Sequence, residues 1–206
     1  MIDRIQWLEH GSFRIQGPPC IYINPWRVAR TSTPANLILV TNDQYDHCSP
    51  ADVEKLRGPN TVVVGNEAAA NVLGSQTTVL RPWQSLNIGA ARVTAVPAYT
   101  FTHHYPVSQG GLGFVISLDY YDIYYAGCTD IVPEHAYIQA DIVILPVGGS
   151  QGTMTLDRAL DYINRTKPSW VIPSHWGTTG GTLLDAQALS RALDGQTKVV
   201  MPEKVR

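Results

Sequence analysis

The feature that most constrains the fold is a series of short runs rich in β-branched and aromatic residues, each bounded by turn-forming residues such as Gly, Pro and Asn. Runs of this kind are typical of short β-strands. We predict strands over residues 5–8, 13–15, 20–23, 37–40, 61–64, 77–80, 92–96, 113–117, 123–125, 142–145, 170–172 and 198–200. The first three are close together in the sequence, which favours an antiparallel meander.

Helices are fewer, and we predict them over residues 49–56, 66–73, 155–166 and 182–193. The first has a clear start, since Ser49 can cap it, Pro50 suits the first helical position and Asp52 places an acid in the first turn. No linker rich in Pro, Gly or Ser divides the chain. We therefore expect a single domain over residues 1–206, with sheets packed together and helices outside.

Composition excludes several classes of function. The formal charge of −2 argues against a basic nucleic-acid surface. No apolar run approaches the roughly 20 residues that span a bilayer, and residues 1–6 do not resemble a signal peptide. Cys20, Cys48 and Cys128 are an odd number at wide spacing, so we expect no disulfide framework and a cytoplasmic protein. We expect the partner to be a small-molecule substrate or ligand, and we expect no binding to nucleic acid or membrane. The sequence leaves the oligomeric state open.

Polar residues that can carry chemistry follow four of the predicted strands. They are Asp43, Asp46 and His47 after residues 37–40, His103 and His104 after 92–96, Cys128 after 123–125, and His175 after 170–172. Asp, His and Cys side chains bind divalent metals, and loops at strand ends commonly carry function. This pattern suggests a metal site where these loops meet.

Seven segments, spread along most of the chain, resemble the motifs of one family. They are WLEHGSF (7–13), IYINPW (21–26), LILVTNDQYDHCSP (37–50), AVPAY (95–99), YYAGCTDIVP (124–133), LPVGG (145–149) and VIPSHWG (171–177). On these motifs the chain resembles the metallo-β-lactamase-fold hydrolases, and within them the small metal-dependent hydrolase branch related to UlaG-type lactonases. The resemblance implies an α/β (α+β) chain folded as a four-layer αββα sandwich, with a metal site at one edge.

The metal motif departs from the family pattern. The family's HxHxDH motif supplies two histidines to a first metal and Asp-His to a second, whereas residues 42–47 read NDQYDH. Asn42 and Gln44 therefore replace both first-metal histidines, and Cys128 replaces the family's bridging Asp. An Asp before Pro25 is replaced by Asn24. His103 and His104 both stand near the family's middle histidine, and the sequence does not choose between them.

These departures predict one metal rather than two. Asn and Gln offer neutral oxygens, which are poor zinc ligands beside imidazole or thiolate, so the first site should be empty or weak. The resemblance leaves a second site of Asp46, His47, Cys128 and His175, a suitable tetrahedral set for one zinc ion. We predict Asp46 and Asp43 as catalytic residues, with Asp43 orienting a water molecule. His10 is expected to make structural hydrogen bonds beneath the site, and His135 to lie on the surface.

Three hypotheses for function remain open. The first is a hydrolase in which zinc activates water against an ester, lactone, amide or phosphoester bond; it requires that an open position remain, for example if His47 stays out of the shell. The second is an inactive family member, with a metal or with none, that binds a ligand or partner in the remnant cleft. The third is a metal-free hydrolase with Cys128 as nucleophile and His175 as base.

Overall fold

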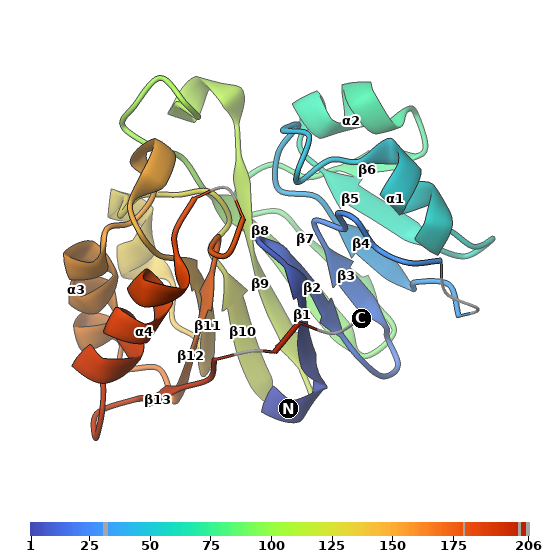
Figure 1. The fold of residues 1–206 in the computed structure, drawn as a ribbon. Helices are drawn as coiled ribbons and strands as arrows, with labels where there is room; N and C mark the ends of the chain where they lie inside the picture. Colours follow the sequence, from blue (N-terminus) through green and yellow to red (C-terminus); the bar gives the residue numbers. More distant parts are fainter. Residues whose placement is uncertain (31–32, 179, 202, 205–206) are drawn as a thin grey trace.

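The computed structural model describes residues 1–30, 33–178, 180–201 and 203–204, and its strands form two sheets (Figure 1). The first sheet has the order β1-β2-β3-β4-β5-β6. Its strands are β1 (Ile5–Glu9), β2 (Ser12–Ile15), β3 (Ile21–Ile23), β4 (Leu37–Leu39), β5 (Val62–Gly65) and β6 (Thr77–Val79). The second has the order β13-β12-β11-β10-β9-β8-β7. Its strands are β7 (Ser85–Ile88), β8 (Ala91–Pro97), β9 (Leu112–Leu118), β10 (Tyr121–Tyr125), β11 (Ile142–Pro146), β12 (Trp170–Ser174) and β13 (Lys198–Val199).

Each sheet combines an antiparallel and a parallel part. Strands β1 to β3 form the predicted antiparallel meander, and β3 to β6 are parallel. Strands β7 to β10 are antiparallel, and β10 to β13 are parallel. Parallel neighbours need crossover connections, which are usually helical. The helices α1 (Pro50–Leu56), α2 (Glu67–Leu73), α3 (Leu156–Thr166) and α4 (Leu183–Ala192) lie in such connections.

The layer order agrees with the predicted αββα sandwich. Figure 1 shows α1 and α2 on the outer side of the first sheet and α3 and α4 on the outer side of the second. The main apolar core lies between the sheets, where Phe13 and Leu39 of the first sheet belong to one buried cluster with Phe114 and Ile144 of the second. Burial of this shared core is what joins the two sheets.

The predicted helices and all twelve predicted strands are present, and the missed strand is β7. Its sequence SLNI includes Ser and Asn, and the strand forms an edge of its sheet with every side chain exposed or half-buried. A partly solvated edge strand lacks the apolar run by which the others were predicted.

The prediction that His135 lies on the surface is wrong. His135 lies in η3 (Pro133–Tyr137) and is buried. The backbone N–H of Val132 donates to His135 Nδ1 at 3.2 Å, and His135 Nε2 lies 2.9 Å from the hydroxyl of Tyr124. The contact with Val132 is local, whereas Tyr124 belongs to β10, and a single histidine in a sequence does not reveal this second partner.

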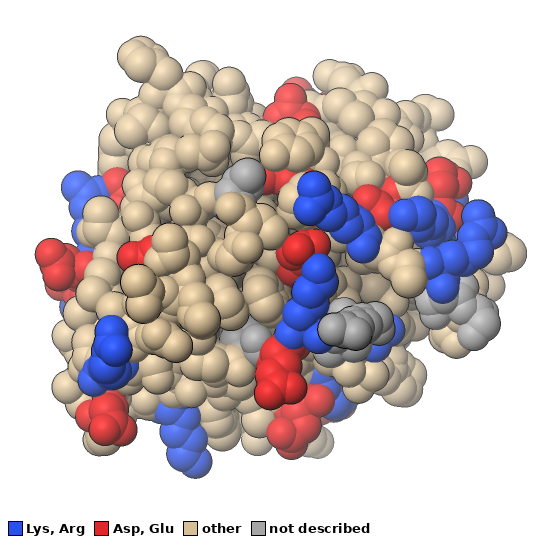
Figure 2. Space-filling model, viewed as in Figure 1, with Lys and Arg blue, Asp and Glu red and all other residues tan. Residues whose placement is uncertain are grey.

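The surface shows no strong segregation of charge in the view of Figure 2. Lys and Arg side chains are interspersed with Asp and Glu on that face. No helix in the described part of the chain is long and apolar enough to cross a bilayer.

A buried hydrogen-bond bridge joins the two sheets near the ends of their strands. The hydroxyl of Tyr125 in β10 donates to the carbonyl of Gly11 at 2.7 Å and accepts from Asn24 Nδ2 at 3.1 Å. Asn24 Oδ1 in turn accepts from the backbone N–H of Thr41 at 2.9 Å. The bridge fixes the turn after β1, the loop after β3 and the loop after β4 against the second sheet.

Tyr125→Phe should therefore lower the free energy of unfolding by about 1–3 kcal/mol, because it leaves the Gly11 carbonyl and the Asn24 amide buried without this partner. Urea unfolding followed by circular dichroism measures the effect. Tyr120→Phe is the matched control, because Tyr120 is fully exposed. Its change should stay within about 0.5 kcal/mol, and equal effects of the two variants would contradict the bridge.

Candidate metal centre

Five polar side chains meet where loops from both sheets come together. His10 comes from the turn between β1 and β2, Asp46 and His47 from the loop between β4 and α1, Cys128 from the loop after β10, and His175 from the loop after β12. All five are buried. These polar residues lie in loops that follow hydrophobic strands. Because the loops belong to both sheets, the five side chains meet only when the sheets pack together.

Three potential ligand atoms converge on one point. His47 Nε2 and His175 Nε2 are 2.9 Å apart, and Cys128 Sγ lies 3.2 Å from the first and 3.3 Å from the second. Zinc bonds to nitrogen and sulfur near 2.0–2.3 Å, so tetrahedral ligand atoms lie roughly 3.3–3.8 Å apart. The cluster is slightly more contracted than such a shell, and a small outward movement of each side chain would accommodate an ion.

Asp46 orients two of the histidines. Its Oδ1 lies 2.8 Å from His47 Nδ1, and its Oδ2 lies 3.3 Å from His10 Nε2. Burial opposes ionisation of this carboxyl, but the hydrogen bonds from His10 and His47 outweigh burial and hold its pKa well below the usual range. The carboxylate occupies Nδ1 of His47 and leaves Nε2 directed at the cluster, as carboxylates commonly do behind metal-binding histidines.

His175 is oriented in the same way by its neighbour in sequence. Ser174 Oγ lies 3.0 Å from His175 Nδ1, which leaves His175 Nε2 facing His47 and Cys128. Burial, together with positive charge on His10 and His47, lowers the pKa of His175 far below its usual value. His175 is therefore neutral, and its Nε2 can offer a lone pair to a metal.

The raised pKa of His47 indicates that the cluster stabilises a positive charge. Burial alone would lower its pKa, but the negative charge of Cys128 and the hydrogen bond with Asp46 outweigh burial and raise the pKa of His47 to about 10. His47 therefore holds a second ring proton near neutral pH, and its Nε2 faces His175 and Cys128. A divalent metal bound by the same atoms would displace that proton.

His10 has a role that the sequence analysis missed. Its Nδ1 is buried and has no hydrogen-bond partner among the described residues. A ligand atom of His10 lies within 4.8 Å of ligand atoms of both His47 and His175. An orphaned nitrogen beside such a cluster fits a metal ligand or an acceptor for a water proton. The available signal was the position of His10 within the motif over residues 7–13.

Backbone geometry brings His10 and His175 together. Both residues have positive φ, +51° and +58°, a region that non-glycine residues rarely adopt. The His175 N–H donates to the His10 carbonyl at 3.1 Å. A Cβ on Gly11 would lie 3.0 Å from His175 Nε2, so a side chain at position 11 would displace the ring. Local strain of this kind is common at functional sites.

The other predicted site residues lie in a second group. Tyr105 donates its hydroxyl to Asp43 Oδ1 at 3.2 Å, so exposed Asp43 contacts a tyrosine rather than a histidine of the cluster. Asn42 Oδ1 accepts from the backbone N–H of Gln44 at 3.0 Å. Gln44 Nε2 lies 2.7 Å from His104 Nε2.

The contact between Gln44 and His104 concerns both the choice between His103 and His104 and the state of the first metal site. It places His104, and not exposed His103, beside the predicted remnant of the first metal site. An amide NH₂ group can donate to the His104 lone pair that a metal would otherwise take. The structure therefore brings four predicted ligands together: Asp46, His47, Cys128 and His175. The other group keeps hydrogen bonds of its own: Asn42, Asp43, Gln44 and His104. The catalytic role of Asp43 stays a prediction.

Comparison with known proteins defines the class. The family model described as a β-lactamase superfamily domain matches residues 4–175, and the chain belongs to this superfamily. A solved structure of a metal-dependent hydrolase from Parabacteroides distasonis superposes on this chain with a TM-score of 0.84. The two sequences are 26% identical, and the match covers 98% of this chain and 93% of that one. Igni18, a metallo hydrolase from Ignicoccus hospitalis, is 19% identical with a TM-score of 0.78 over 98% of this chain and 95% of its own, and shows the shared fold.

Sequence relatives narrow the class further. A UPF0173 metal-dependent hydrolase of Nitratidesulfovibrio vulgaris is 31% identical over 86% of this chain and 82% of its own length. Another, from Pyrococcus abyssi, is 26% identical over 96% of this chain and 95% of its own. The chain is thus a member of a family of proteins named as metal-dependent hydrolases, as the motifs indicated.

Ser174→Ala should weaken the binding of a divalent metal by about tenfold, because loss of a group that orients a metal-binding histidine typically costs 10–100-fold in affinity. Competition with a chromogenic metal chelator measures this. Ser12→Ala is the matched control, since Ser12 is also fully buried but its hydroxyl has no hydrogen-bond partner among the described residues. Equal affinities of the two variants would show that Ser174 does not orient His175.

Proposed function

We propose that this protein is a metal-dependent hydrolase that uses one zinc ion bound by His47, Cys128 and His175. The observation that carries the proposal is the convergence of two imidazole nitrogens and one thiol sulfur within 2.9–3.3 Å of one another in a buried place. Nitrogen and sulfur ligands favour zinc over calcium or magnesium. The names of the sequence relatives support hydrolysis as the reaction.

Three protein ligands suit catalysis better than four. A structural zinc site is closed by four protein ligands, whereas a catalytic site keeps one position open. When bound, zinc supplies Lewis acidity that lowers the pKa of a water molecule to about 7. The substrate is proposed to contain an ester, lactone, amide or phosphoester bond.

The pair formed by Asp46 and His10 supplies the base. The Asp46 carboxylate lies 3.3 Å from His10 Nε2, which leaves Nδ1 as the ring nitrogen that is free to act as the base. That Nδ1 has no hydrogen-bond partner among the described residues, so it can accept a proton from water. In this proposal Asp46 orients His10 and His47, in place of the metal-ligand role that the sequence predicted for it.

A single metal is consistent with the former first-metal positions. Gln44 and His104 bond to each other at 2.7 Å, and Asn42 accepts from a backbone N–H. Each group that could have served a first metal therefore has a protein partner. The proposed reaction needs no second ion.

The decisive measurement is zinc content together with turnover. Purified protein should contain about one zinc per chain by elemental mass spectrometry, and Cys128→Ser and His175→Ala should lose it. His10→Gln should retain zinc but lose at least about 100-fold in kcat on whichever ester, lactone or phosphoester of a screened panel the wild type cleaves, because general base catalysis contributes 10²–10⁴-fold.

His103→Gln is the control for this series, because His103 is exposed and outside the cluster. It should keep both zinc and activity. Absence of zinc from the wild type would refute the proposal. Loss of zinc from His10→Gln would instead make His10 a ligand and close the shell, which would favour a structural metal in an inactive protein.

The same contacts favour a second candidate, a metal-free hydrolase. Cys128 Sγ lies 3.3 Å from His175 Nε2, a distance that suits a thiol nucleophile and its base. In that case turnover would survive chelation, and iodoacetamide would inactivate the chelated protein. Under the zinc proposal, chelation itself abolishes turnover and added zinc restores it.

A further inference from the structure

We propose that Arg27 forms an anion-binding subsite at the rim of the metal centre, so that the substrate carries a carboxylate or phosphate group apart from the bond that is cleaved. The inference rests on the proposed function for the place of the reaction. Beyond that function, the inference states the chemical class of the substrate. Its basis is the position, the fixation and the unpaired charge of Arg27.

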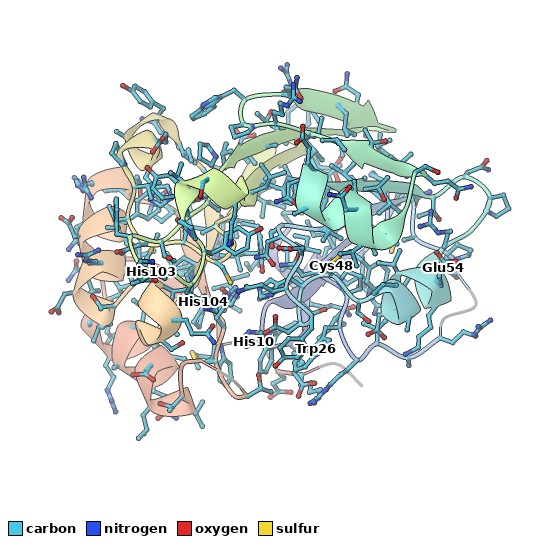
Figure 3. The ribbon with its side chains drawn as sticks, turned by 90° about the horizontal axis from the view of Figure 1, so that it is seen from above. His10, Trp26, Cys48, Glu54, His103 and His104 are labelled. Carbon is cyan, nitrogen blue, oxygen red and sulfur yellow. The ribbon has the colours of Figure 1, made fainter. Side chains whose placement is uncertain are left out.

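The position of Arg27 follows from its contact with Trp26. The guanidinium carbon lies 4.2 Å from the centre of the Trp26 ring, within the range of a cation–π contact. The Trp26 ring also makes an edge contact with His10, with centroids 6.0 Å apart, and Figure 3 shows the two residues side by side. Trp26 is buried whereas Arg27 is exposed, so one aromatic ring separates the guanidinium from the proposed base.

A second aromatic residue extends this rim. Tyr45 makes an edge contact with Trp26, with centroids 6.1 Å apart, and is 67% exposed. It lies next to Asp46 in the sequence and therefore adjoins the metal centre from the opposite loop. An exposed tyrosine and an exposed arginine that both contact one buried tryptophan make a surface that can hold an organic anion beside the centre.

The backbone of Arg27 is fixed from α1. The Asp52 carboxylate accepts from the backbone N–H groups of Arg27 at 2.9 Å and Val28 at 3.2 Å, and Lys55 Nζ donates to the same carboxylate at 2.8 Å. Arg27 has a φ of +54°, which residues with a side chain rarely adopt. The loop thus holds Arg27 in an uncommon conformation, and the contact with Trp26 fixes the side chain as well.

The charge of Arg27 has no acidic partner among the described residues. Arg57 pairs with Glu54 at 2.6 Å, whereas Arg27 forms no ion pair with any described residue. The two nearby carboxylates are already engaged, Asp52 by backbone N–H groups and Lys55, and Asp46 by histidines. Guanidinium pairs with carboxylate or phosphate through two parallel hydrogen bonds. An oxyanion group of a substrate supplies the partner that the chain itself lacks.

The test compares ligands that differ only by a second anionic group. Succinate, glutarate and adipate are titrated by calorimetry against propionate, butyrate and valerate, in which one carboxylate is replaced by hydrogen; 3-phosphonopropionate and 4-phosphonobutyrate serve as the phosphate-like arm. The series covers several separations between the two groups. In the wild type, at least one doubly anionic ligand should bind about tenfold or more tightly than its monocarboxylate. Arg27→Gln should abolish this advantage.

Arg30→Gln is the matched control, because it removes the same charge from an exposed arginine three residues away. It should leave the advantage within about twofold of the wild-type value, and Arg27→Lys should retain only part of it. An absent advantage in the wild type, or equal losses in Arg27→Gln and Arg30→Gln, would overturn the subsite.

Zinc content is measured in the same samples, and the titrations are repeated after chelation. A wild type without zinc would contradict the proposed function, whereas a loss confined to Arg27→Gln would still establish the subsite. Conversely, normal zinc content with no effect of Arg27→Gln would refute the subsite alone. The two failures are therefore distinguishable.

Discussion

The carboxylate of Asp46 is the interaction on which the candidate centre depends. A buried charge is costly unless it is paired and hydrogen-bonded, and Asp46 meets this requirement by facing one nitrogen each of His10 and His47. That pairing decides which nitrogens remain available. It directs His47 Nε2 at Cys128 and His175, and it leaves His10 Nδ1 without a partner among the described residues. The orientation of two rings thus depends on one side chain, and with it the proposed metal binding and proton transfer.

The sandwich makes this arrangement possible because both sheets end in the same place. Tyr125 of the second sheet bonds to Gly11 and Asn24 of loops from the first, and the His175 N–H bonds to the His10 carbonyl. Rigid strands hold the ends of these loops, and the loops supply the polar side chains. The backbone at Gly11 lies close to the His175 ring, and His10 and His175 have left-handed backbone conformations. These conformations cost free energy locally, and packing of the surrounding core offsets that cost.

The departures from the family motif form a consistent set in space. Asn24 joins the bridge between the sheets, Asn42 and Gln44 bond within their own loop and to His104, and Cys128 adds sulfur to the histidine pair. Each replaced side chain has a defined partner in the structure, which is consistent with the proposed one-metal centre. Arg27, which has no acidic partner among the described residues, contacts Trp26 and is held by Asp52 at the proposed rim of the centre.

The sequence by itself determined the secondary structure and the family. Apolar runs bounded by turn residues located twelve of the strands, and Ser49 caps its helix as predicted. Asn66, Thr155 and Thr182, at which the other helices were predicted to begin, are their N-cap residues in the structure. These signals are local, so a single chain displays them. Strand β7 escaped because an edge strand with Ser and Asn on a solvated sheet has no apolar run. Only the tertiary structure decided the roles of His10, His104, His135 and Arg27, because each role depends on partners distant in the sequence: Asp46, Gln44, Tyr124 and Asp52.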